Sequence, residues 1–473
     1  MASTTVPLFI NGKDIVTDVT FDVIGPTTGQ VQHQSSDATA THAIAAVEAA
    51  QNAFPAWSQT TPGARREIFL KAANVLDART KELSDYLMTE TGGTTDWAAF
   101  NVMLGRECLL GCAGSTFAIE GKIPSLQDPK YGGLIVKEPY GVIFAVAPWN
   151  GPYPLGFRAV AWAIAAGNTV VLKGSELSPR TLWAISSVFK EAGLPDGVLN
   201  FITSSPANAA EVTKTIIEHP FVKKINFTGS TNVGRIIAKL AGENLKPVLL
   251  ELGGKAPAIV CDDADLDVAA KECAIGAFAN AGQVCMCTER IIVHEKIATE
   301  FEAAIKTWVD RLFAADQSAP VLVQAAAVTR NKALMKDAAG KGARVVHGDV
   351  DASEAVNTHM RPIVISGVTS DMDIYKQESF GPTVSIITYS SDEEAVRVAN
   401  DTEYGLSSAV FSKDLRRAMR IARQIETGAV HINRMTVQDE AALPHGGAKA
   451  SGFGRFNGVI DEWVRTKNIT FDL

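Results

Sequence analysis

Short apolar runs alternate with stretches of helical spacing through the middle of the chain. Five runs are rich in aliphatic and aromatic residues and indicate buried strands: 142–146, 168–173, 198–202, 224–227 and 248–251. Helical spacing between them predicts helices over 157–166, 179–192, 207–218 and 234–241. Strict alternation of this kind predicts a parallel sheet covered by helices, with ligands bound at the carboxyl ends of its strands.

The same alternation continues after the pair Gly253-Gly254. Strands are expected over 258–260 and 290–293, a helix over 265–279, and a further helix from residue 295. The sequence therefore predicts two α/β domains. We expect the first to take residues 1–117 and 140–252 and the second to take 253–442, with a cleft between them.

The N-terminal region is predicted to be mostly helical. Alanines and valines recur at helical spacing over 37–54, with Thr41 as a candidate cap, and a helical pattern continues over 57–91. Polar turns then alternate with β-like runs over 121–140, which predicts a hairpin that leaves the main body. This excursion fits either an oligomerisation arm or an ordinary surface hairpin.

Composition narrows the function classes. The chain has 473 residues and a formal net charge of −8, with its 44 Lys and Arg scattered. We therefore expect neither nucleic acid nor an anionic membrane surface as a partner. No apolar run reaches the roughly 18 residues of a membrane span.

The cysteines indicate a reducing compartment. Six cysteines are too few for a disulfide framework in this length, and the first residues lack the charged and apolar regions of an export signal. A cytoplasmic setting is expected. Cys285 and Cys287 have the C-x-C spacing of metal ligands, but no second Cys or His pair accompanies them, so we predict no metal site.

A thiol, a carboxylate and an amide stand in an order that suits acyl chemistry. Cys285 follows a Gly-Gln pair, Glu251 closes a predicted strand, and Asn150 follows another. In such a set a thiolate attacks a carbonyl, an amide holds the oxyanion, and a carboxylate activates water.

Together with the segment 443–455, these residues resemble the NAD(P)-dependent aldehyde dehydrogenase family. The resemblance implies two Rossmann-like α/β domains, one for the cofactor and one for catalysis, plus a small β oligomerisation arm built from 118–139 and 443–473. It also implies a homodimer or homotetramer. The expected reaction runs through a thiohemiacetal and a thioester on Cys285, with Glu251 as the base for hydrolysis and Asn150 in the oxyanion hole.

The resemblance also assigns a cofactor side. The turn 227–234 follows a strand and opens a helix, so its backbone N–H groups could hold a pyrophosphate, although it is neither G-x-G-x-x-G nor a Walker A loop. A carboxylate at Glu176 would accept from a ribose diol, which favours NAD and leaves NADP as an alternative. The residues expected at the cofactor are Trp149, Lys173, Glu176, Gly229, Ser230, Gly234, Glu378 and Phe380.

The helix after Asn150 is implied to line the aldehyde tunnel. Pro154 and Arg158 fall one turn apart on it. A guanidinium on a tunnel wall needs a partner, so it should meet a substrate hydroxyl or carboxylate, or stack on a ring. Nearby segments resemble the salicylaldehyde, vanillin and benzaldehyde dehydrogenase branch. We therefore expect an aromatic, hydroxylated aldehyde as substrate. The expected wall residues are Tyr153, Leu155, Arg158 and His445, the last in place of the family's usual aromatic.

Four alternatives stay open. The substrate could be an aliphatic semialdehyde, or the protein could be a cysteine hydrolase or acyltransferase that needs no dinucleotide. A catalytically silent relative would keep the fold alone. Arg158 could form a structural ion pair outside the tunnel. If the cysteine stretch is extended, the thiols of Cys285 and Cys287 point the same way, and the role of Cys287 is left undecided.

Overall fold

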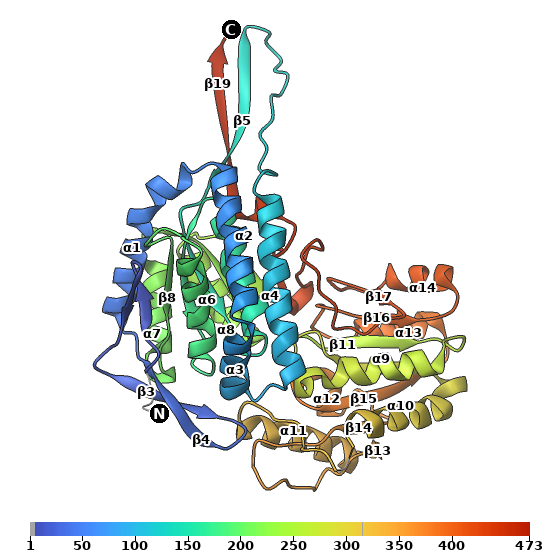
Figure 1. Cartoon of the computed structure of the whole chain (residues 1–473). Helices are drawn as coiled ribbons and strands as arrows, with labels where there is room; N and C mark the ends of the chain where they lie inside the picture. Colours follow the sequence, from blue (N-terminus) through green and yellow to red (C-terminus); the bar gives the residue numbers. More distant parts are fainter. Residues whose placement is uncertain (1–4, 315) are drawn as a thin grey trace.

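A computed structural model describes residues 5–314 and 316–473, and two large sheets organise it (Figure 1). The first has eight strands, of which the central five are parallel. In spatial order these are β10 (Val248–Glu251), β9 (Val222–Thr228), β6 (Val142–Ala147), β7 (Thr169–Gly174) and β8 (Leu199–Ile202). Antiparallel strands close its edges: β18 (Gly452–Phe453), β1 (Leu8–Ile10) and β2 (Lys13–Ile15).

Helices cover both faces of this sheet, because successive side chains of a buried strand point to opposite faces. In β6, Ile143 and Ala145 pack into one core, while Val142 and Phe144 pack into the other. The first core is completed by α2 (Pro62–Ala78), α3 (Thr80–Thr91), α4 (Thr95–Ser115), α5 (Pro152–Ala165) and α6 (Pro179–Glu191). The second is completed by α1 (Ala40–Ser58), α7 (Pro206–Glu218) and α8 (Thr231–Glu243).

The second sheet has seven strands, all parallel to their neighbours except β13. Its order is β13 (Arg344–His347), β14 (Ile363–Ser366), β15 (Thr383–Tyr389), β12 (Thr288–His294), β11 (Ala256–Val260), β16 (Ala409–Phe411) and β17 (His431–Ile432). One face carries α9 (Leu266–Phe278) and α10 (Ala298–Leu312). The other carries α11 (Ala325–Gly340), α12 (Asp373–Lys376), α13 (Asp392–Asn400) and α14 (Leu415–Ala422). The α/β fold with Rossmann-like sheets is thus confirmed.

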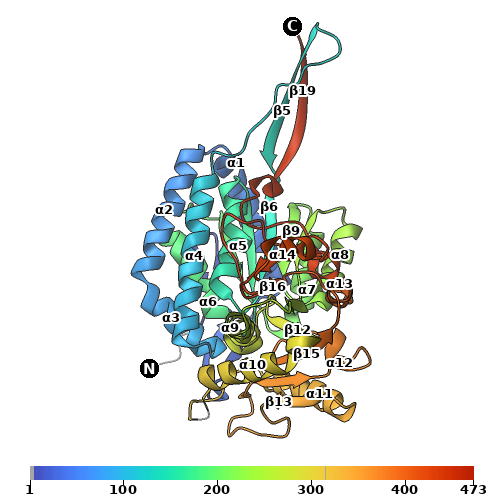
Figure 2. The ribbon, with the colours of Figure 1, turned by 90° about the vertical axis from the view of Figure 1, so that its right-hand side faces the viewer.

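A two-stranded ribbon projects from the body in both views (Figure 1, Figure 2). It pairs β5 (Tyr131–Pro139) with β19 (Val464–Asp472), which lie far apart in sequence. The predicted local hairpin over 121–140 is therefore wrong in its pairing, since only the bridge Lys122 to Ile135 joins the two halves of that segment. Several apolar side chains on and beside the ribbon stay exposed. Ile123, in the segment before β5, is 83 % exposed.

Other differences from the predicted elements have local causes. Helix α1 begins after Thr39, two residues before the predicted cap. The helical pattern over 57–91 breaks because Thr61 is extended and its hydroxyl accepts from the N–H of Ala64, which starts a new helix at Pro62. Strand β18 ties part of the C-terminal segment to the first sheet. The predicted domain limits stay predictions. None of the described helices is long and apolar enough to cross a membrane.

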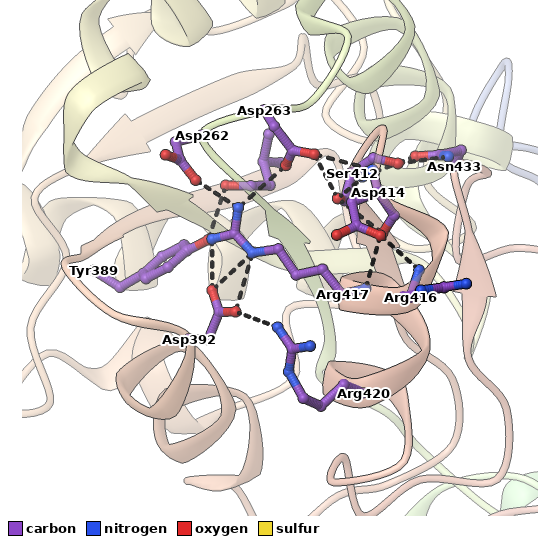
Figure 3. A network of polar contacts seen from close by, with 11 residues as sticks. Asp262, Asp263, Tyr389, Asp392, Ser412, Asp414, Arg416, Arg417, Arg420 and Asn433 are labelled. Atoms are coloured by element: carbon purple, nitrogen blue, oxygen red, sulfur yellow. Dashed lines mark hydrogen bonds and ion pairs between the residues drawn. The ribbon is translucent and has the colours of Figure 1, made fainter.

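A cluster of charges fixes α14 to the second sheet (Figure 3). The Arg417 guanidinium lies 2.6 Å from carboxylate oxygens of Asp262 and Asp392 and 3.3 Å from Asp263. Asp262 and Asp263 follow β11, and Asp392 opens α13, so one cation joins three elements. Its hydrogen bond lowers the pKa of the Asp262 carboxyl, and hydrogen bonding to Asp392 raises that of Arg417.

We predict that Arg417→Ala lowers the free energy of unfolding by about 1–3 kcal/mol, because three neighbouring carboxylates lose their shared cation. Urea unfolding followed by fluorescence measures this. Arg416→Ala, an exposed arginine on the same helix, is the matched control and should leave the midpoint unchanged. The Asp262 pKa is depressed in the folded state, so this stabilisation is present above the ordinary carboxyl pKa and is lost as the pH falls through the lowered one. Equal midpoints for Arg417→Ala and native protein at pH 7 would contradict the prediction.

Candidate active site

A cavity of about 450 Å³ opens at the carboxyl ends of β6, β9 and β10. Residues that follow these strands line it from the first sheet, and residues near Cys285 and Glu378 line it from the second part of the chain. Cys285, Glu251 and Asn150 are all on its wall. The structure therefore brings the three residues of the predicted acyl chemistry together, where a parallel sheet is expected to bind ligands.

Close backbone approaches hold the cysteine loop. Asn280, Ala281 and Gly282 all have positive φ, and a Cβ on Gly282 would lie 2.0 Å from the carbonyl oxygen of Gly381. A Cβ on Gly254 would lie 2.3 Å from the carbonyl oxygen of Cys285. Only glycine fits at these two contacts, so the loop that carries the thiol is set by backbone packing.

Asn150 is tied to the same loop. Its side-chain amide donates to the carbonyl oxygen of Gln283 at 3.0 Å, and the Asn280 amide donates to the carbonyl oxygen of Asn150 at 3.1 Å. Gln283 continues outward, with its Oε1 accepting from the Val323 N–H at 2.9 Å. These bonds orient the Asn150 amide beside Cys285.

The thiol and the carboxylate share a dry environment. Burial and the nearby Glu251 carboxylate raise the pKa of the Cys285 thiol, and the charge of Arg158 opposes them. Glu251 is 1 % exposed, and neither of its carboxylate oxygens has a hydrogen-bond partner among the residues that the structure describes. Both oxygens are therefore free to accept a proton from water.

The turn after β9 is built as predicted. Ser230 caps α8, where its hydroxyl accepts from the Val233 N–H at 3.4 Å, and both Gly229 and Ser230 line the cavity. Gly234 does not line it. A Cβ there would lie 2.5 Å from the Leu252 side chain, so this glycine serves close packing of α8 on the sheet, and its cofactor contact stays a prediction.

The opposite wall carries Glu378 and Phe380. Glu378 accepts from the Gly254 N–H at 2.8 Å, and burial raises its pKa to about 8. The Phe380 ring lies edge-on to Trp149 at 5.9 Å, and both line the cavity. Glu289 of β12 fixes this wall because it accepts from the N–H groups of Ser379 and Phe380 at 2.9 and 3.1 Å.

Lys173 and Glu176 lie at and just after the end of β7, beyond the lining of the cavity. The Lys173 ammonium is 7 % exposed, and burial lowers its pKa. Its ammonium makes no hydrogen bond within the described ranges. Ser175 donates to a Glu176 oxygen at 3.3 Å. The N-terminus of α8, the buried Lys173 cation and the carboxylates of Glu176 and Glu378 form a donor and acceptor set that fits a dinucleotide.

A second, narrower cavity of about 50 Å³ reaches Cys285 from the other side. It shares Asn150, Leu155 and Cys285 with the first cavity. It continues into an outer cavity of about 510 Å³. The residues common to the narrow and outer parts are Phe100, Leu104, Pro154, Arg158, Val437 and Asp439. Cys285 therefore stands where two passages meet.

Of the residues predicted to line the aldehyde tunnel, some line the narrow cavity and one does not. Leu155, Arg158 and His445 line the narrow cavity. Tyr153 does not, because its side chain is fully buried and its hydroxyl donates to the carbonyl oxygen of Leu83 at 2.7 Å, so its predicted wall position is wrong. Arg158 forms an ion pair with Asp439 and packs on the Phe456 ring at 5.9 Å. The pair lies on the wall and not outside it.

Sequence reasoning missed several residues of the site. Asp439 lies in an irregular loop without a periodic pattern, and the sequence marks Gln283 only as a neighbour of the cysteine. Cys287 is buried, and its N–H donates to Val284 in a tight turn, so the stretch is not extended and the two thiols do not share a face. In the part of the chain that is described, no group of three or more His, Cys, Asp or Glu side chains could hold a metal ion.

Known proteins resemble the whole chain. The model of the aldehyde dehydrogenase family matches residues 15–469. A vanillin dehydrogenase from Pseudomonas fluorescens is 44 % identical over 98 % of both chains. The crystal structure of a salicylaldehyde dehydrogenase from Pseudomonas putida G7, complexed with salicylaldehyde, is 41 % identical and superposes with a TM-score of 0.96 over 99 % of this chain and 98 % of that one. A betaine aldehyde dehydrogenase from Staphylococcus aureus in complex with NAD+ is 31 % identical over 98 % and 94 %, with a TM-score of 0.93.

The match of the family model to nearly the whole length agrees with the meeting of thiol, amide and carboxylate at the two passages. The chain belongs to the aldehyde dehydrogenase family.

Proposed function

We propose that the protein oxidises an aromatic, hydroxylated aldehyde to its carboxylic acid with NAD as acceptor. The observation that carries this proposal is the place of Cys285, which lies where the larger cavity meets the narrow passage, with Asn150 lining both. The relatives named for vanillin and salicylaldehyde support the substrate class, and the relative solved with NAD+ supports the acceptor.

In the first step Cys285 adds to the aldehyde carbon. Burial raises the pKa of its thiol, so the thiol loses its proton to water as it attacks, and Glu251 stays available as the base for hydrolysis. The oxygen that becomes negative is stabilised by the Asn150 amide, which the Gln283 and Asn280 contacts hold in place.

A bound NAD would supply the hydride acceptor, and loss of the hydride from the substrate carbon would leave a thioester on Cys285. Trp149, Glu378 and Phe380 would hold the nicotinamide half of the dinucleotide. Ser230 would meet the pyrophosphate, and Lys173 and Glu176 the adenosine ribose. Glu251 then takes a proton from water, whose oxygen bonds to the acyl carbon, and the sulfur leaves as thiolate.

The walls of the narrow passage favour an aromatic ring. Trp97, Phe100, Leu155 and Met286 offer aromatic and apolar surface. Arg158 adds polarity, because its Nη1 is buried and has no hydrogen-bond partner among the described residues. A ring hydroxyl would satisfy that nitrogen.

The pairing of Arg158 weighs against a semialdehyde as substrate. The Asp439 carboxylate already balances the guanidinium charge, so a second carboxylate on the substrate would meet a neutral pair and not a free cation. A neutral hydroxyl needs only the remaining donor. The observed ion pair therefore favours the hydroxylated aromatic aldehyde over the aliphatic alternative.

We also propose that the β5–β19 ribbon is an oligomerisation arm and that the protein acts in the cytoplasm as a homodimer or homotetramer. Exposed apolar side chains on and beside the ribbon support this assignment, because monomeric surfaces seldom leave such residues grouped on a projecting element. Light scattering on the native chain and on a chain without β19 tests the assembly.

Removing the nucleophile or the base should separate the two half-reactions. Cys285→Ala should lower aldehyde oxidation by at least about a thousandfold, because no covalent intermediate forms. Glu251→Gln should leave a first burst of reduced cofactor and then turn over about a hundredfold more slowly, because hydrolysis loses its base. Stopped-flow absorbance of the reduced cofactor measures both. Cys287→Ala is the matched control with native kinetics; full turnover in Cys285→Ala would refute the assigned nucleophile.

Glu176 should set the preference for NAD. A 2′-phosphate would meet this carboxylate as a like charge, so we expect kcat/KM to be about tenfold higher or more with NAD than with NADP. Glu176→Gln should bring the two kcat/KM values closer together, mainly by lowering KM for NADP. The exposed Glu243→Gln serves as the control for loss of one negative charge. A higher kcat/KM with NADP than with NAD in the native enzyme would overturn this assignment.

The unpaired nitrogen of Arg158 should discriminate among aldehydes. In the double variant Arg158→Met, Asp439→Asn, which leaves no buried charge alone, kcat/KM for salicylaldehyde should fall about tenfold, whereas benzaldehyde and hexanal should change less than about threefold. Steady-state kinetics with the three aldehydes measures this. An equal fall for all three, or a native preference for hexanal, would contradict the proposed substrate class.

A further inference from the structure

A line of polar side chains runs from the nucleophile to the outer cavity. In order it contains Cys285, Glu251, His445, Asp439 and Arg158. They come from four separate places in the sequence. The acyl chemistry uses the first two, and the substrate wall uses the last two. His445 lies between the two halves; it lines the narrow cavity, but the substrate wall gives its imidazole no partner.

The imidazole of His445 faces the Glu251 carboxylate. Its Nε2 lies 3.8 Å from a carboxylate oxygen of Glu251. Both atoms are buried, and neither has a hydrogen-bond partner among the described residues. Two unsatisfied buried groups of complementary chemistry at this distance are expected to serve a reaction, because each would otherwise cost stability.

The other ring nitrogen faces Asp439. His445 Nδ1 lies 3.8 Å from Asp439 Oδ1, which also accepts from the Asn457 amide at 3.0 Å. Asp439 lines the outer cavity as well as the narrow passage, so it stands closer to solvent than Glu251 does. The imidazole therefore bridges a buried carboxylate and one at the entrance.

The backbone keeps the imidazole in this position. The N–H of His445 donates to the carbonyl oxygen of Phe456 at 2.9 Å, and the N–H of Phe456 donates back at 2.8 Å. Each 3.8 Å gap is longer than a hydrogen bond, and a side-chain shift of about 1 Å closes it. Catalytic hydrogen bonds are often long before the substrate binds.

We propose that His445 is a positioning and relay residue, which takes the proton that Glu251 removes from the hydrolytic water and passes it toward Asp439. The proposal rests on the proposed function, because it concerns hydrolysis of the thioester on Cys285. Glu251 is 1 % exposed and must lose its proton before the next turnover. His445 accepts this proton from Glu251.

The step balances without any further reactant. A water O–H bond breaks, its proton goes to Glu251, and the water oxygen bonds to the acyl carbon. The carbon–sulfur bond breaks, and its electron pair returns to Cys285. The proton then moves from Glu251 to His445 Nε2, while the proton on Nδ1 leaves toward Asp439, so the imidazole ends neutral in its other tautomer.

The surroundings keep His445 neutral and able to accept. Burial lowers its pKa, the charges of Arg158 and Arg455 lower it further, and Glu251 opposes them. Asp439 and Cys285 are the other titratable groups that line the same passage. Because the pKa is lowered, the neutral form prevails at pH 7, and relay is lost as the pH falls through that lowered pKa.

The test isolates hydrolysis with an activated ester. p-Nitrophenyl acetate acylates Cys285 with release of nitrophenolate, so the burst reports acylation and the following linear phase reports loss of the acyl group. His445→Phe keeps the ring volume, and His445→Gln keeps a hydrogen-bonding side chain without titration. Both should keep the burst within about twofold, lower the linear rate about tenfold, and lose the native acidic limb of its pH profile. His431→Phe, a partly buried histidine of β17, should leave both phases native.

Each other result overturns the proposal. A linear rate within twofold of native in both variants shows that His445 moves no proton. Burst and linear phase falling by the same factor show a structural role. Native hydrolysis in His445→Gln with slow hydrolysis in His445→Phe shows that a hydrogen bond alone suffices. Failure of the proposed function itself looks different, since native protein would then show no burst that depends on Cys285.

Discussion

The active site depends on how closely three stretches of backbone approach one another. Gly254 touches the Cys285 carbonyl, and Gly282 touches the Gly381 carbonyl, at distances that exclude any Cβ. These contacts join the end of β10, the cysteine loop and the segment that carries Glu378. Since the three functional groups are attached to stretches in direct contact, their mutual geometry does not depend on long, adjustable side chains.

Much of this arrangement could be predicted from the sequence. The strands β6 to β12 and the helices between them lie within a few residues of their expected limits, because short apolar runs and helical spacing are strong local signals. Asn150 follows β6 and Glu251 ends β10, and parallel strands end at one edge of a sheet, so their meeting needs no knowledge of side-chain packing. Cys285 precedes β12 of the second sheet and reaches the same edge through the cysteine loop. The long-range pair of β5 with β19 agrees with the arm that the resemblance builds from 118–139 and 443–473, whereas the local hairpin over 121–140 does not form.

The errors and omissions have a common cause. Helix α5 is buried along nearly all its length, so its sequence has no polar face to show which side chains reach the passage. Tyr153 and Arg158 were equally plausible there, and only packing separates them. The same holds for the Arg417 cluster, whose three carboxylates are brought together by strand order and not by any sequence motif. The sequence predicts a phosphate contact at Gly234, but it does not show that Leu252 packs where a side chain at this position would lie.

The pairing of β18 with β10 has a consequence for how the chain folds during its synthesis. Strand β10 ends in Glu251, and its outer edge stays open until Gly452 and Phe453 reach it. Gly452 and Phe453 follow β10 only after all seven strands of the second sheet, so the ribosome must make that sheet before the first one can close. The N-terminal half can form helices early, but its sheet must wait with an unpaired edge, which is the state most exposed to wrong pairing. A chain released before residue 452 would leave the carboxylate strand uncovered, so activity requires the segment that follows the second sheet.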